Sequence, residues 1–435
     1  MLRAALLTMG LWLPLAAPFA LAAGPAPAAA TVVHAGRLLA DPASGKVLER
    51  QSVLIGSDGR VIGVEAGFLR PEGARVVDAG DRFVLPGLID SHVHLTSELG
   101  PTQLLDNVQL TTADSALRGA GYAEKTLIAG FTTVADLGAD NDSIFALRRA
   151  IAEGRVPGPR IVASGAAVTP DGGHGDANGY SPHVIDVLRS ESACSGADDC
   201  SRVTRRQVQA GADLIKITAT GGVLSNTAAG VAQQLTDAEM AAIVGAAHAM
   251  GRRVTAHAHA AGGIAAALRA GVDSIEHGTY LDDAGIRLMK QSEAWLVPTM
   301  MAGWWVAQLA DKGGVLTPAQ AEKARLVGPE LVAMVKRARA AGVRIAYGTD
   351  TGVSPHGMNA REFGLLVEAG YSPLETIRFA TVDAAEHLQL TGTAGRIAPG
   401  YSADLVAVDG DPLKDVGTLM DMRLVIARGA VHRAP

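Results

Sequence analysis

The sequence predicts an α/β protein: a (β/α)8 TIM barrel with a small β-sandwich domain built from both chain termini. Three observations lead to this prediction. The chain has 435 residues, enough for a full barrel and an accessory domain. Eight apolar, β-branched runs lie between about residues 83 and 352 and alternate with stretches of helical period. Short strand-like runs separated by turns dominate both ends of the chain.

Residues 1–23 have the pattern of a secretory signal peptide. Arg3 supplies a positive start, residues 4–20 are mostly apolar, and Ala20-Leu21-Ala22 is a small-x-small cleavage site. A membrane anchor is the alternative. No later segment is long and apolar enough to span a bilayer, so we expect an exported protein, periplasmic or secreted, with no membrane contact after cleavage.

Residues 31–86 and 395–435 are expected to form the composite β-sandwich. Asp58-Gly59 lies between two apolar runs, which is a hairpin signal, and residues 403–408 and 422–431 look equally strand-like. Because the middle of the chain differs, we infer one β domain with the barrel, residues 87–394, inserted into it. Two separate β modules are the alternative.

The middle of the chain repeats one unit: a helical stretch, a glycine stop and a β-branched run. The stops are Gly130, Gly211, Gly251, Gly271 and Gly342. Glycine suits the left-handed position just past a helix C-terminus, so each stop predicts the end of a helix before the next strand. An open doubly wound sheet is the alternative, but no GxGxxG follows the first strand.

Composition and cysteine content narrow the class of protein. Apolar residues make up 48% and charged residues 19%, which is typical of a globular enzyme. The net charge is −6 and no basic cluster stands out, so nucleic acid is not expected as a partner. The two cysteines, Cys194 and Cys200, are expected to form a disulfide in an oxidising compartment; two free thiols are the alternative.

Residues that suit metal binding recur where the predicted strands end. His92 and His94 stand two apart on the first strand, so both point to the same side. In barrels of this type the active site lies at the carboxyl ends of the strands. Random histidines would not favour strand ends. The strand-end set is His92, His94, Lys216, His257, His259, His277 and Asp350.

Lys216 lies in the apolar run Leu214–Thr218, where burying an ammonium is costly. One interpretation is a buried ion pair with Asp136 or Glu276. We favour another, in which the neutral amine captures carbon dioxide and the carbamate bridges two cations.

These motifs resemble the amidohydrolase superfamily along most of the chain. The GGHG loop at residues 172–175, TAHAHA at 255–260, SIEHG at 274–278 and GTDTG at 348–352 are similar to the imidazolonepropionase-like group. That group includes exported carboxypeptidase-like dipeptidases and ochratoxin-hydrolysing amidohydrolases. True imidazolonepropionases are mononuclear and lack the bridging lysine, so Lys216 counts against that activity.

The resemblance implies a cofactor of two zinc ions bridged by carboxylated Lys216. His92, His94, Lys216 and Asp350 would hold one ion, and Lys216, His257 and His277 the other. The attacking group would be a metal-bridging hydroxide, with Asp350 as the proton shuttle. The resembling enzymes are often octamers, so a homo-oligomer is expected.

Five residues, His259 of the strand-end set among them, are candidates for substrate contact. His174 lies in a glycine loop where little else can pack, and His259 lies beyond the end of its strand. His356 follows Asp350 by six residues, whereas Trp304 and Trp305 either line an apolar pocket or pack a helix.

The favoured function is hydrolysis of an amide bond to a C-terminal amino acid. The substrates would be dipeptides or N-acyl amino acids, with ochratoxin A as an accidental one. A lactonase or phosphotriesterase is the first alternative, because the same metal site attacks esters. An exported metal- or ligand-binding protein is the second.

Overall fold

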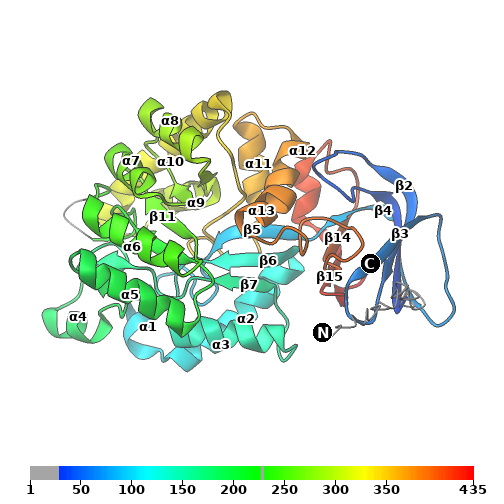
Figure 1. The fold of residues 1–435 in the computed structure, drawn as a ribbon, viewed down its shortest axis with the longest axis horizontal. Helices are drawn as coiled ribbons and strands as arrows, with labels where there is room; N and C mark the ends of the chain where they lie inside the picture. The colour runs from blue at the N-terminus through cyan, green and yellow to red at the C-terminus, as the bar shows by residue number, and fades with distance from the viewer. Residues whose placement is uncertain (1–28, 227–229) are drawn as a thin grey trace, which may run out of the picture.

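The computed structural model describes residues 29–226 and 230–435; the expected signal peptide, residues 1–23, lies outside them. Within the two described ranges no helix has both the length and the apolar character that a membrane span requires. Figure 1 shows a barrel wrapped by helices and, at its side, a β-sheet where the chain ends.

Strands from both ends of the chain form one seven-stranded sheet, in the order β16-β15-β14-β4-β1-β2-β3. The long strand β4 joins the ends, because it pairs with β1 in parallel and with β14 antiparallel. Two separate β modules are thereby excluded. The Asp58-Gly59 hairpin is confirmed between β2 and β3. The strands are β1 (Thr31–Leu38), β2 (Leu48–Ile55), β3 (Val61–Ala66), β4 (Arg75–Pro86), β14 (Leu405–Val408), β15 (Met422–Ala427) and β16 (Ala430–Arg433).

This terminal sheet has a core of its own. Val53 from the N-terminal part and Leu405 and Ile426 from the C-terminal part belong to one buried apolar cluster. The description of this part as a two-layered sandwich, and the division of the chain at 86/87 and 394/395, stay predictions.

Seven regular parallel strands make up most of the barrel wall. They form two sheets, β5–β6–β7 and β10–β11–β12–β13, and Val168, in the segment that follows β7, makes an isolated pairing with Ile217 of β10. The strands are β5 (Leu88–Val93), β6 (Phe131–Asp136), β7 (Arg160–Ala163), β10 (Ile215–Thr218), β11 (Val254–Ala258), β12 (Ser274–His277) and β13 (Trp295–Val297).

The predicted eighth strand closes the barrel without being a regular strand. Ile345 pairs with Leu296 of β13, and Thr351 pairs with Val93 of β5, both in parallel. Between these points Asp350 has a positive φ of 58°, which extended backbone does not allow. The segment therefore bends at the residue that carries its functional carboxylate.

The glycine stops are confirmed as turning points between helix and strand. Gly271 and Gly342 are left-handed caps of α7 and α10, and the glycines at 130, 211 and 251 also have positive φ. The helices are α1 (Gln103–Gln109), α2 (Thr112–Ile128), α3 (Asn141–Ala152), α4 (Pro182–Leu188), α5 (Ala197–Ala210), α6 (Asp237–Ala249), α7 (Ala261–Ala270), α8 (Asp283–Ser292), α9 (Met300–Lys312), α10 (Pro318–Ala341), α11 (Arg361–Glu368), α12 (Pro373–Arg378) and α13 (Ala384–His387).

The predicted disulfide is present and anchors the loop region after β7. Cys194 and Cys200 are bonded and both are buried. Cys194 belongs to β9 (Ala193–Cys194), which pairs with β8 (Thr169–Pro170) directly before the glycine-rich loop that carries His174. The alternative of two free thiols is excluded.

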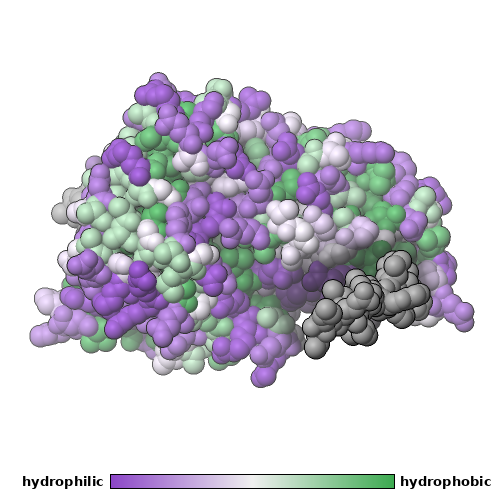
Figure 2. All heavy atoms as spheres, in the orientation of Figure 1, coloured by the Kyte–Doolittle hydropathy of each residue, from purple (hydrophilic) through white to green (hydrophobic). Residues whose placement is uncertain are grey.

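Hydrophilic residues cover much of the face shown in Figure 2, and apolar residues form separate patches between them. Among the large apolar side chains that remain exposed are Leu104 and Leu105 of α1 and Val187 of α4.

Candidate metal centre

The barrel brings the predicted ligands together at the carboxyl ends of its strands. Two groups have ligand atoms within 4.8 Å of one another: His92, His94 and Asp350 form the first, and His257, His259 and His277 the second. All except His94 are buried, and His94 is partly exposed. Imidazole and carboxylate groups at this density are typical of a metal centre.

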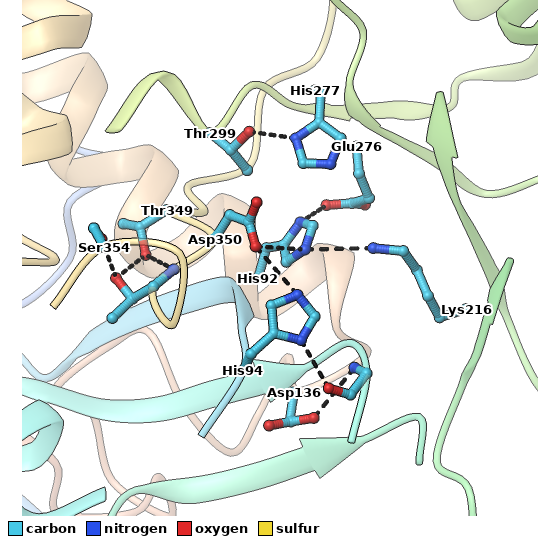
Figure 3. A network of polar contacts seen from close by, with 12 residues as sticks. His92, His94, Asp136, Lys216, Glu276, His277, Thr299, Thr349, Asp350 and Ser354 are labelled. Atoms are coloured by element: carbon cyan, nitrogen blue, oxygen red, sulfur yellow. Dashed lines mark hydrogen bonds and ion pairs between the residues drawn. The ribbon is translucent and has the colours of Figure 1, made fainter. Parts of the chain in front are cut away.

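The first group is arranged around the carboxylate of Asp350. Its Oδ1 lies 3.1 Å from His94 Nε2 and 3.5 Å from His92 Nε2. Lys216 reaches in from β10 and places its Nζ 3.3 Å from His92 Nε2 (Figure 3). One carboxylate, two imidazoles and an amine thus meet at a single point.

The second group contains one histidine more than the predicted ligand set. The ring centre of His277 lies 4.6 Å from that of His257 and 4.9 Å from that of His259. The amide of His259 donates to Thr220 Oγ1, which holds its backbone directly after β11. His259 therefore lies within ligand distance as well as in the substrate region where it was expected.

Each of four histidines has its Nδ1 occupied by a neighbour, so Nε2 is the ring nitrogen that remains for a metal ion. Such partners fix the tautomer and the ring orientation of metal-binding histidines. The pairs are His92 with Glu276 Oε2 at 2.8 Å, His94 with Gly138 O at 2.8 Å, His259 with Thr279 Oγ1 at 2.7 Å and His277 with Thr299 Oγ1 at 2.7 Å.

Glu276 and Asp136 are two carboxylates that hold the histidines or their supporting loops in place. Glu276 also accepts from the Thr255 and Ser274 hydroxyls, so its carboxylate is held on both sides. Asp136 accepts from the amides of Leu95 and Gly138, and thereby fixes the turn whose carbonyl oxygen bonds to His94.

In the described part of the chain no carboxylate lies within ion-pair distance of Lys216. The simple ion-pair interpretation of Lys216 therefore loses its support.

Burial keeps most of these groups in their neutral forms. It holds the pKa of His92, His257 and His277 well below the ordinary imidazole value, and nearby cationic groups lower these pKa values further. Burial also lowers the pKa of Lys216, although the carboxylates around it oppose this effect. Neutral imidazoles and an amine that can lose its proton are the states that metal binding and carbamate formation require.

Two further features agree with metal binding at these residues. Asp350 Oδ1 is buried without a well-formed hydrogen bond, although it faces two imidazoles. His277, Thr299 and Asp350 have φ values of 67°, 49° and 58°, a strained conformation for residues other than glycine. Strain and an unsatisfied buried oxygen are both accounted for by a ligand cage.

The centre lies in a cavity of about 650 Å³ that opens between the loops after the strands. His174 belongs to its wall, as expected. The His174 amide donates to Gln234 Oε1, while its Nδ1 is buried without a partner. Burial lowers the pKa of His174 to about 3, and its ring centre lies 4.2 Å from that of His257. A neutral ring with a free nitrogen is thus held beside the second group.

The structure does not bring Trp304, Trp305 or His356 to the cavity wall. Helix α9 turns a different face inward, since the lining residues of its N-cap and its first turns recur at helical spacing: Thr299, Ala302, Gly303 and Val306. Trp304 lies under the Arg361 guanidinium, and His356 stacks on Tyr122 and bonds to Ser97 O. The expectation that these three residues contact substrate is therefore not carried forward.

Asp90 is a site residue that the sequence interpretation missed. Its carboxylate accepts from the amides of His92 and Thr349, from the Thr349 hydroxyl and from the Asn359 side chain. These bonds join β5 to the bent eighth segment, and so fix His92 relative to Asp350. The available signal was its position two residues before His92, on the same side of the strand.

Lys323 of α10 is a second missed residue. Its Nζ donates to Gly222 O at 2.7 Å and to Ser225 O at 2.6 Å, in the loop after β10. Gly222 in turn lies so close to His174 that a Cβ there would meet the ring at 2.3 Å. The lysine thus holds one wall of the cavity against His174.

Replacing Lys323 by methionine is expected to lower kcat/KM about tenfold with little change in Tm, because two bonds from a charged donor hold a loop rather than the core. The matched control is Lys336→Met, an exposed residue of the same helix. Steady-state kinetics and thermal unfolding of both variants test this. Equal kinetics for the two variants would show that activity does not depend on the bonds between Lys323 and the loop after β10.

The chain matches the model of the Amidohydrolase family over residues 83–431. The ochratoxinase of Aspergillus niger is 30% identical over 417 residues, which cover 91% of this chain and 84% of that protein. The imidazolonepropionase of Acidiphilium cryptum (strain JF-5) is 28% identical over 409 residues, covering 82% of this chain and 87% of that protein.

Solved structures show the same similarity in space. A Xaa-Pro dipeptidase with bound methionine in the active site has a TM-score of 0.87 and 35% identity, covering 93% of this chain and 100% of that chain. A prolidase complexed with N-methylphosphonate-L-proline has a TM-score of 0.84 and 32% identity, with 93% and 100% covered. The A. niger ochratoxinase has a TM-score of 0.80 and 28% identity, with 93% and 96% covered.

Proposed function

Because the chain belongs to the amidohydrolase family and is a hydrolase of amide bonds, we propose that it releases a C-terminal amino acid from dipeptides or N-acyl amino acids. The observation that carries this proposal is the meeting of both histidine groups, Lys216 and Asp350 in one cavity. The dipeptidase, the prolidase and the ochratoxinase named above support the choice of amide bond. Ochratoxin A is accordingly included among the substrates we propose.

The cofactor we propose is a pair of zinc ions. His92, His94 and Asp350 would hold one ion, and His257 and His277 the other. His259 would serve either as a further ligand or as a substrate contact. Bound there, the ions would lower the pKa of a water molecule and polarise the scissile carbonyl.

Lys216 is proposed to carry a carbamate that bridges the two ligand groups. Its neutral amine would form an N–C bond with carbon dioxide and lose one proton, which leaves an anion with two oxygens. The lowered pKa of Lys216 and its position beside His92 support this modification. Among the described residues, no carboxylate lies close enough to Lys216 to form an ion pair with its amine.

Asp350 is proposed as the proton shuttle. Burial alone would raise the pKa of this carboxyl, but His92 and His94 more than offset burial and hold it below its usual value. It would therefore be ionised at neutral pH, able to accept a proton from the attacking water and return it to the leaving nitrogen. His174 is proposed to contact the substrate carbonyl, which its buried and unpartnered Nδ1 supports.

The proposed reaction is tested with one acyl group joined either to phenylalanine or to phenylalaninamide. We expect the free carboxylate to be cleaved at least about tenfold faster in kcat/KM, since a charge-assisted bond contributes 1.5–3 kcal/mol. Equal rates would rule out recognition of a C-terminal residue. Cleavage of lactones or organophosphates in place of both amides would move the enzyme to the ester-hydrolysing class.

Export and assembly are part of the same proposal. A cleaved signal peptide and a periplasmic or secreted location agree with the disulfide between Cys194 and Cys200. We also propose a homo-oligomer, for which the exposed apolar side chains of α1 and α4 offer surface.

A further inference from the structure

The cavity has two unlike ends. The segments after β6 and β7 contribute the charged side chains Asp140, Arg189 and Glu191 beside the apolar Leu137 and Leu188, and this part of the wall is called the charged rim. The other end is aliphatic and is formed by α9, α10 and the loop after β10. Its lining side chains are Val223, Leu224, Ala302, Val306, Val327 and Leu331.

Each end belongs to one ligand group. His94 bonds to Gly138 O, two residues before Asp140, so the first group adjoins the Asp140 side of the charged rim. His277 bonds to Thr299 Oγ1 at the start of α9, so the second group adjoins the aliphatic end. A substrate whose reacting carbonyl lies between the groups must place one arm at each end.

Arg189 is the exposed cation of this rim. Among the described residues of the cavity wall it is the only arginine, and its guanidinium has no hydrogen bond or ion pair to any residue of the described chain. The only lysine of the wall, Lys216, is buried at the metal centre. A free cation at a substrate entrance is available to a carboxylate.

The backbone around Arg189 is held in place on both sides. Arg189 caps α4, and the amide of the next residue, Ser190, donates to Asp176 Oδ1 at 2.8 Å. Asp176 also accepts from Gly172 N, in the loop that carries His174. Arg189 thus belongs to a segment tied to the loop that carries His174, which lowers the entropic cost of binding a substrate there.

We propose that Arg189 binds the α-carboxylate of the leaving amino acid, while the aliphatic end receives the acyl group. This inference rests on the proposed function and adds its orientation and substrate class: amino acids acylated by an apolar group. Glu191 and Asp140 on the same rim disfavour a second negative charge, so leaving residues with neutral side chains are preferred over aspartate and glutamate.

The carboxylate contact is tested with Arg189→Gln and, as matched control, Arg205→Gln, an exposed arginine of α5 that lies away from the cavity. Arg189→Gln is expected to lower kcat/KM for the acyl-phenylalanine substrate about tenfold, mainly through KM, and to leave the phenylalaninamide substrate unchanged. The effect should shrink as salt is raised. Equal losses on both substrates, or no loss on either, would overturn the assignment of Arg189.

The aliphatic end is tested with Val306→Phe, which narrows it, and with Gln308→Phe on the exposed side of α9 as control. Val306→Phe should lower kcat/KM for a long acyl chain about tenfold more than for an acetyl group. Val306→Ala, which enlarges the same end, should shift the ratio of kcat/KM for the long acyl chain to kcat/KM for the acetyl group in the opposite direction. An equal effect on long and short chains would place the acyl group elsewhere.

The two proposals fail in different ways. If the unaltered enzyme cleaves no acyl-amino acid, the proposed function is wrong. If it cleaves them and Arg189→Gln behaves like Arg205→Gln, the function stands and only the orientation is rejected.

Discussion

Replacing Lys216 by alanine is expected to lower kcat about a thousandfold or more and to reduce the bound metal. The physical reason is that the bridging anion would be lost, and with it several kcal/mol of stabilisation of the developing charge. Lys216 is buried, has no carboxylate partner among the described residues and approaches His92 within 3.3 Å. Activity assays and elemental analysis of the same preparation provide the measurement.

A control separates the bridging role from a general effect on folding. Lys216→Met fills the same space without an anion, so it should be folded and equally inactive. Short carboxylic acids added to the alanine variant should restore part of the activity, because they can occupy the space of the carbamate. Retention of full metal content and more than about a tenth of the activity would reject the bridge.

Changing Asp350 to asparagine is expected to lower kcat by about 10²- to 10⁴-fold, the usual range for loss of a general acid–base group. Asparagine keeps the shape of the side chain but cannot accept a proton. His92 and His94 hold the pKa of Asp350 below its usual value, so the carboxylate is the form present at neutral pH and is lost only as the pH falls. The acidic limb of the rate profile that belongs to Asp350 should therefore be absent in the variant.

The control for this variant is Asp283→Asn, at an exposed position at the start of α8. Its kinetics should match those of the unaltered enzyme. Turnover by Asp350→Asn within a factor of about ten of the unaltered enzyme would assign the proton transfer to another group.

The barrel and its ligand residues could be predicted because their signals are local. Each glycine stop marks a helix end, and HxH on a strand fixes two side chains on one side whatever the rest of the fold does. The family resemblance then gave the second group and Lys216 their roles. The same local reasoning predicted a regular eighth strand, which the structure does not have. The positive φ of Asp350 interrupts this segment and depends on its contacts with β5, which lie far away in the sequence.

The features that the sequence did not reveal arise from contacts between distant segments. Asp90 owes its role to Thr349 and Asn359, more than 250 residues away. Which face of α9 meets the cavity depends on its packing against α10, and this packing turns Trp304 and Trp305 away from the centre. The charged rim is formed by loops, where no periodicity predicts which side chains converge.

The account depends on two metal ions held by the two ligand groups. Elemental analysis of the purified enzyme, followed by chelation, dialysis and stepwise return of zinc, tests this most directly. We predict about two equivalents of metal per chain, loss of activity on chelation and recovery that is complete only when both equivalents are restored. One equivalent or none, with activity unchanged after chelation, would contradict it.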